Sequence, residues 1–69
     1  MTFDDACKLI LADPKADGYA KAYADAGFGM TDPDARRVQA LYIASNLARW
    51  RHPQAKEVRA LLKDIGKTR

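Results

Sequence analysis

The sequence has few of the residues that build metal centres and disulfide bonds. Its 69 residues include one cysteine, Cys7, and one histidine, His52. An intrachain disulfide needs two cysteines, and a structural zinc site takes four ligands from cysteine and histidine, so both are excluded. Cys7 lies on the apolar face of a predicted helix, which favours a small core residue over a reactive thiol. Stability must therefore come from the burial of apolar side chains.

Long hydrophobic runs are also absent. The longest uninterrupted run of apolar residues is Ala40 to Ala44, far short of the roughly 20 residues that span a bilayer. The first residues carry two aspartates and no basic lead, which is the reverse of a secretory signal. We expect a cytoplasmic protein with no membrane segment.

Motifs of catalysis and cofactor binding are missing as well. The chain has no glycine-rich phosphate loop and no paired histidines of a metalloprotease helix, and Ser45 falls within a predicted helix instead of at a nucleophile elbow. A DNA-binding helix-turn-helix centred on Gly27 would need a small residue where Tyr23 stands and an apolar residue where Pro33 stands, so this motif is not matched. We therefore expect no enzyme activity, no catalytic or metal-ligating residue and no cofactor.

Charge is divided unevenly along the chain. Residues 1–34 have a net charge of −4 and residues 35–69 a net charge of +7, which gives +3 overall. Such asymmetry indicates a basic face that binds nucleic acid or an acidic protein. The alternative is that the acidic and basic halves pack together, within one copy or between two copies. A chain of this size buries only about 60% of its unfolded surface. Its limited core favours self-association into a homo-oligomer.

Three proline pairs divide the chain into helical segments. Asp13-Pro14, Asp32-Pro33 and His52-Pro53 each match a helix start, because proline is favoured at the first helical position and aspartate caps it. No stretch alternates β-branched residues as a strand does. The pattern predicts one all-α domain over residues 1–69. It is a small bundle of three or four helices with a long central third helix and a tight corner before the fourth.

Local signals set the expected helix bounds. The first helix begins after Thr2, with Asp5 completing a capping box. The second begins at Pro14 or Gly18 and runs to residue 26, with Gly27 supplying a left-handed residue at its end. The third runs from residue 32 to Arg51, and the fourth from residue 53 to 65.

Apolar spacing predicts the buried faces. The first helix is expected to bury Phe3, Ala6, Cys7 and Ile10, and the second to present a stripe of Tyr19, Ala22, Tyr23 and Ala26. In the last two helices we expect Leu41, Ala44, Leu47, Leu62 and Ile65 to be buried, with Val38 and Tyr42 outside the main apolar arc. Tyr19 and Tyr23 are either core residues or exposed anchors for a partner.

A basic stripe on the fourth predicted helix is the sharpest functional signal. Arg59, Lys63 and Lys67 stand four residues apart, and like charges at this spacing cost a few tenths of a kcal/mol per pair. Either an anionic partner or only solvent faces them. The candidate basic partner-binding face comprises Arg49, Arg51, Lys56, Arg59, Lys63 and Lys67, with Arg69 nearby in sequence. The candidate aromatic anchors are Tyr19, Tyr23 and Trp50.

Residues 39–65 read QALYIASNLARWRHPQAKEVRALLKDI. This segment resembles small uncharacterised helical proteins encoded by bacteriophages and prophages, through Q-x-L-Y-I-x-S-N-L-x-x-W-R followed by A-K-x-V-R-x-x-L-K. The resemblance implies a short accessory protein made in a bacterial host cytoplasm, and it assigns no residue a role.

Two functions remain open from the sequence. The first is a non-enzymatic interaction protein of a phage or mobile element that binds a host or phage protein, as an inhibitor of host defence would. The second is a nucleic-acid-binding accessory protein that uses the basic face of the last helix.

Overall fold

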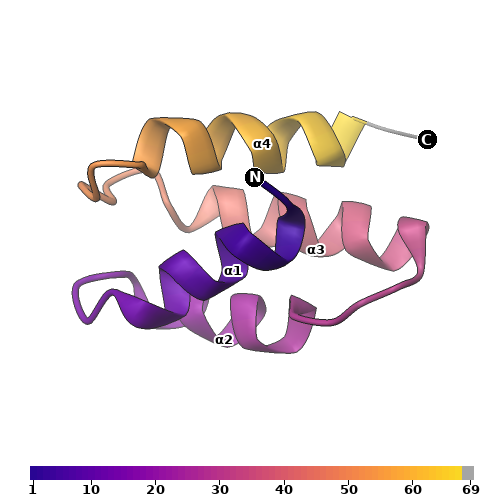
Figure 1. Cartoon of the computed structure of the whole chain (residues 1–69), viewed down its shortest axis with the longest axis horizontal. Coiled ribbons are helices and arrows are strands. Elements are labelled where there is room, and N and C mark those ends of the chain that lie inside the picture. Colours follow the sequence, from indigo (N-terminus) through magenta and orange to yellow (C-terminus); the bar gives the residue numbers. More distant parts are fainter. Residues whose placement is uncertain (68–69) are drawn as a thin grey trace.

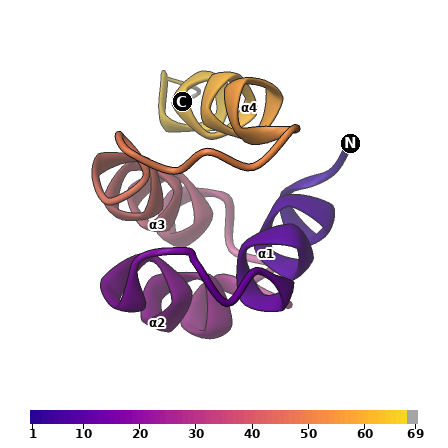
Figure 2. The same cartoon turned by 90° about the vertical axis from the view of Figure 1, so that its left-hand side faces the viewer.

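The computed structural model describes residues 1–67 and shows an all-α bundle. Its four helices are α1 (Phe3–Ala12), α2 (Gly18–Gly27), α3 (Pro33–Ser45) and α4 (Ala55–Lys67), with no strand among the described residues. Figures 1 and 2 show α3 between α2 and α4, with α1 beside α2. The predicted fold class is confirmed.

Side-chain caps start α1 and α3 where the sequence predicts. The Thr2 N–H donates to Asp5 Oδ2 at 3.0 Å, and the Asp5 N–H donates to Thr2 Oγ1 at 3.1 Å, so the capping box is complete. Asp32 accepts from the N–H of Ala35 at 3.0 Å, with Pro33 as the first helical residue. Both starts depend only on residues that are neighbours in sequence.

The second helix begins at Gly18, the later of the two predicted starts. Asp17 caps it by accepting from the N–H groups of Tyr19 at 2.8 Å and Ala20 at 3.2 Å. Asp13, the residue before Pro14, instead accepts from the N–H of Lys15 at 2.9 Å and closes a turn. The aspartate-proline pair at 13–14 therefore ends the first segment and does not begin a helix.

The end of α2 differs from the prediction. Gly27 is the last helical residue and is buried. The left-handed residue is Gly29, with φ of 84°, and its N–H donates to Asp4 Oδ1 at 3.1 Å. The expectation that Gly27 supplies the left-handed conformation is wrong, because Gly27 is needed for close packing against Phe3 and Gln39.

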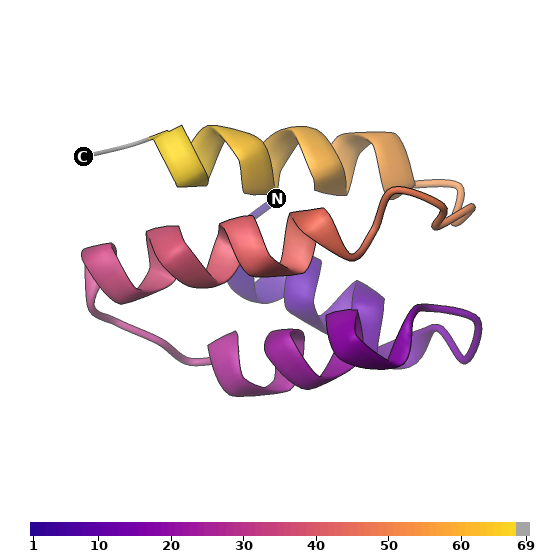
Figure 3. The same cartoon turned by 180° about the vertical axis from the view of Figure 1, so that it is seen from behind.

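The predicted end of α3 at Arg51 is also wrong, since the helix stops at Ser45. Ser45 Oγ and Asn46 Nδ2 each donate to the Tyr42 carbonyl at 2.9 Å and compete with the backbone bond that would continue the helix. Residues 46–54 form a connection of short turns instead of a tight corner. Because of it, α3 and α4 lie side by side and antiparallel, without the steep crossing that a corner would impose (Figure 3).

The core draws buried side chains from all four helices. Its largest fully buried side chains are Ile10, Ile43, Leu47, Leu62, Val58 and Cys7. The burial of Leu47 and Leu62 was predicted and is confirmed, whereas Ala44 and Ile65 are half-buried. Leu41 was expected in the core but is exposed, because it stands on the outer edge of α3 over Gly66 of α4.

The buried face of α2 is shifted from its predicted position. Ala20, Ala24 and Gly27 are buried, while Tyr19, Ala22 and Ala26 are exposed and Tyr23 is half-buried. Small residues on the inner face allow α2 to approach its neighbours closely. The predicted tyrosine stripe therefore points largely away from the core.

Candidate functional site

One face of the molecule exposes large apolar side chains from α2 and α3. Tyr19 is 72% exposed, Val38 37%, Leu41 44% and Tyr42 51%. Val38, Leu41 and Tyr42 are spaced i, i+3, i+4 and therefore share one side of α3. Together with Tyr19 and Tyr23 of α2 they form what we call the apolar face.

Contacts between α2 and α3 hold this face in place. The rings of Tyr23 and Tyr42 stack with centroids 5.4 Å apart and planes 29° apart. Below them, Gln39 Nε2 donates to the Tyr23 carbonyl at 2.7 Å. A stacked aromatic pair loses little further freedom on binding. The tyrosines of the apolar face are thus partly preorganised.

A row of cations on α4 borders the apolar face. Lys56, Arg59, Lys63 and Lys67 recur at three- and four-residue spacing and lie along one edge of the helix. Two contacts turn this edge toward α3. The Arg59 guanidinium donates to the Leu47 and Trp50 carbonyls on the connection after α3, and Gly66 packs against Leu41 of the apolar face. We call these four residues the basic row.

The other two predicted basic residues lie on the connection after α3. Arg49 and Arg51 are exposed, and with Arg59 they line one hollow whose remaining walls are Ala48 and Trp50. We call it the arginine hollow. The structure therefore brings Arg49, Arg51 and Arg59 together, while Lys63 and Lys67 continue along α4. Arg69 lies outside the described residues.

Trp50 occupies the core and not the surface. It is only 7% exposed, and its indole Nε1–H donates to Asp13 Oδ2 at 2.7 Å. His52 stacks on the ring at a centroid distance of 5.0 Å. This placement corrects the expectation that Trp50 is an exposed anchor. Tyr19 alone of the three predicted anchors is fully exposed.

The contact with Trp50 also affects the acidity of Asp13. The N–H of Lys15 and then the indole of Trp50 stabilise the carboxylate and lower the pKa of Asp13 below its usual range. Asp13 therefore joins the end of α1 to the connection between α3 and α4.

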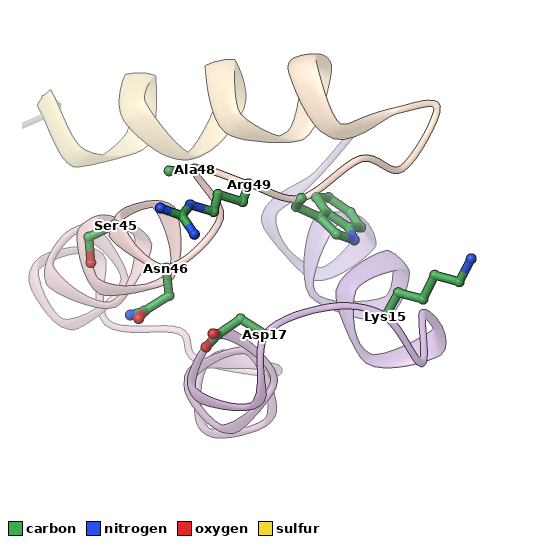
Figure 4. A pocket seen from close by; sticks show the side chains of 7 residues that line it. Lys15, Asp17, Ser45, Asn46, Ala48 and Arg49 are labelled. Atoms are coloured by element: carbon green, nitrogen blue, oxygen red, sulfur yellow. The ribbon is translucent and has the colours of Figure 1, made fainter.

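A polar pocket of about 380 Å³ opens between the connection from α1 to α2 and the connection from α3 to α4 (Figure 4). It is lined by Lys15, Asp17, Ser45, Asn46, Ala48, Arg49 and Trp50. Most of its polar groups serve the fold: Asp17 caps α2, and the side chains of Ser45 and Asn46 donate to a backbone carbonyl. Lys15 points away from the other labelled side chains (Figure 4). The pocket is therefore a crevice between structural elements.

Reactive and metal-binding groups are scarce in the described part of the chain. Burial raises the pKa of the Cys7 thiol to about 11, with a smaller contribution from Asp4, so the thiol is protonated at neutral pH. Residues 1–67 hold no group of three metal-ligating side chains. No described helix is long and apolar enough to cross a membrane.

Part of the apolar face could be read from the sequence. Tyr19 and Tyr23 were candidate anchors, and Val38 and Tyr42 fell outside the main apolar arc of their helix. An apolar residue outside that arc points away from the core, so its position in the sequence indicates the exposed apolar face. Leu41 gave no such signal, since it lay within the arc.

Comparisons with known proteins add nothing to this geometry. No protein-family model matches the chain, and searches of the curated proteins and of the solved structures also find no match. Function is therefore inferred from the surfaces of the chain itself.

Proposed function

We propose that this chain is a non-enzymatic protein-binding module that docks an acidic partner on its apolar face. The observation that carries the proposal is the exposure of Tyr19, Val38, Leu41 and Tyr42 on adjoining parts of α2 and α3. Single exposed apolar residues are ordinary, whereas a contiguous group of them marks an interaction site. Tyrosine is also enriched in protein interfaces.

The basic row defines the chemistry of the partner. Its four cations stand beside the apolar face, whereas Glu57 and Asp64 fall farther round α4 at about 100° per residue. A partner with an apolar centre and acidic residues at its rim would match both features, and the charges would speed association. The resemblance of residues 39–65 to phage-encoded proteins supports an accessory protein of a phage or mobile element. A host-defence protein with an apolar centre and an acidic rim is one partner of this kind.

Nucleic-acid binding is the competing use of the basic row. Lys63 and Lys67 could contact phosphates, and exposed tyrosines can stack on bases. The aliphatic side chains of Val38 and Leu41 favour a protein instead, because they offer no aromatic surface to a base. The following experiment distinguishes protein binding from nucleic-acid binding.

The test uses substitutions that leave the Tyr23–Tyr42 stack intact. Tyr19→Ser and Val38→Ser together remove two exposed side chains of the apolar face, and Leu11→Ser removes an exposed leucine from α1. Binding partners are captured from a lysate of the source cells, identified by mass spectrometry and purified. Their affinity for the parent and both variants is then measured by titration calorimetry.

We expect an acidic protein whose affinity falls at least about tenfold in the double variant and is unchanged in the control. A Lys63→Gln variant should slow its association at low salt. Equal affinity in the parent and the double variant would contradict the proposal. So would a ligand set that contains only nucleic acid or only further copies of this chain.

A further inference from the structure

The arginine hollow concentrates positive charge at the end of the bundle where α3 passes to α4. Arg49, Arg51 and Arg59 line it together with Ala48 and Trp50, and no acidic residue contributes to its walls. Among residues 1–67, none of the three guanidinium groups forms an ion pair with a carboxylate. Three cations that share one concavity repel one another, and an anion between them would relieve that repulsion.

Arg59 is held in a fixed position within this cluster. Its Nη1 atom donates to the Leu47 carbonyl at 3.1 Å and to the Trp50 carbonyl at 3.0 Å. Both N–H bonds of Nη1 are thus used, while the Nε and Nη2 edge of the guanidinium stays available. That edge presents two parallel N–H donors, the arrangement that binds an oxyanion in a bidentate manner.

The backbone between Arg49 and Arg51 is fixed as well. Trp50 is buried between them, donates to Asp13 at 2.7 Å, and its N–H donates to the Leu47 carbonyl at 3.1 Å. The two arginines therefore flank an anchored residue, and both line the hollow. A preorganised turn lowers the entropy lost when a ligand orders these side chains.

We propose that the arginine hollow is a binding site for a phosphate group. Three guanidinium groups match a tetrahedral, doubly charged oxyanion better than a single carboxylate, because each can donate to a different oxygen. This inference goes beyond the docking surface on α2 and α3, since it assigns a different ligand to the connection after α3, where Arg59 of the basic row lines one hollow with Arg49 and Arg51. The phosphate can belong to inorganic phosphate or a small phosphomonoester, or to a nucleic-acid backbone.

The test is a titration monitored by NMR. Sodium phosphate is added to the full chain at constant ionic strength, with sodium chloride as the balancing salt. The side-chain signals of the arginines and the indole N–H of Trp50 report occupancy. A second arm replaces phosphate with a single-stranded oligothymidylate of eight nucleotides.

Two double variants make the titration specific. Arg49→Gln with Arg51→Gln removes two cations from the hollow and spares Arg59, whose backbone contacts support the fold. Lys56→Gln with Lys63→Gln removes the same charge from exposed positions on α4. Circular dichroism melts confirm that both variants are folded before titration.

We expect saturable shifts in the parent, an affinity at least about tenfold weaker in the arginine double variant, and little change in the lysine variant. Affinity for the oligonucleotide well above that for free phosphate, and lost with the arginines, would identify a nucleic-acid backbone as the source. Comparable affinities would identify the free group. Shifts that chloride reproduces, or that weaken equally in both variants, would overturn the proposal.

Discussion

At the scale of single residues, Asp13 carries a role that its place in the sequence does not suggest. It accepts from the N–H of Lys15 and from the indole of Trp50, which lies 37 residues away. The two bonds fix the Trp50 ring in the core and lower the pKa of Asp13. The Asp13 carboxylate thereby links the end of α1 to the connection between α3 and α4.

The lowered pKa gives this contact a defined pH dependence. A carboxylate whose pKa is lower in the folded state stabilises the fold above its usual pKa of 3.8 and loses that contribution as the pH falls through the folded value. Asp13→Asn should therefore lower the melting temperature at pH 7, with a difference from the parent that shrinks as the pH falls below 3.8. Thermal melts followed by circular dichroism between pH 2.5 and 7 measure it, with Asp25→Asn as an exposed control. A constant difference across this range would contradict the account.

Leu47 tests the core at the same scale. It lies beyond the end of α3, yet its side chain is fully buried. Leu47→Ala should reduce the free energy of unfolding by about 2–5 kcal/mol, from lost burial and the cavity left behind. Leu11→Ala, on the exposed side of α1, should cost less than about 1 kcal/mol. Urea unfolding compares the two, and equal losses would mean that Leu47 is not a core residue.

At the scale of elements, the starts of α1 and α3 were predictable, whereas α4 begins at Ala55 and not at the predicted Pro53, and helix packing was less predictable. The caps of α1 and α3 involve residues three positions apart, so local rules were sufficient for them. The end of α3 was mispredicted because the Ser45 and Asn46 side chains, which lie within an apolar helical pattern, donate to the Tyr42 carbonyl and stop the helix there. The inner face of α2 was mispredicted because it is built from Ala20 and Ala24, whose weak hydrophobicity is masked by the tyrosines beside them.

The two glycines at the ends of α2 make this packing testable. A Cβ atom at Gly27 would lie 3.0 Å from Gln39 Cγ and 3.0 Å from Phe3 Cζ, whereas one at Gly18 would meet nothing within 4 Å. Gly27→Ala should destabilise the protein by about 1 kcal/mol despite the better helix propensity of alanine. Gly18→Ala should be neutral or stabilising by up to about 1 kcal/mol. Thermal unfolding compares the pair, and a gain in stability for Gly27→Ala would show that α2 can move away from α1 and α3.

At the scale of the whole molecule, the bundle presents three surfaces of different composition. The apolar face lies on α2 and α3, the basic row borders it on α4, and the arginine hollow lies at the connection between α3 and α4. The sequence supplied most members of these surfaces but not their grouping. Arg59, for example, was predicted to face either an anionic partner or solvent and instead donates to the backbone carbonyls of Leu47 and Trp50. Residues nine and twelve positions away come together only in the folded chain.

The docking claim is tested most directly by photocrosslinking in the source cells. p-Benzoylphenylalanine replaces Tyr19, the most exposed residue of the apolar face, and in a matched chain it replaces Leu11 on α1. The account predicts that irradiation joins an acidic protein to the chain labelled at position 19 and not to the chain labelled at position 11. Equal crosslinking at both positions, or adducts at position 19 with nucleic acid or a second copy alone, would contradict it.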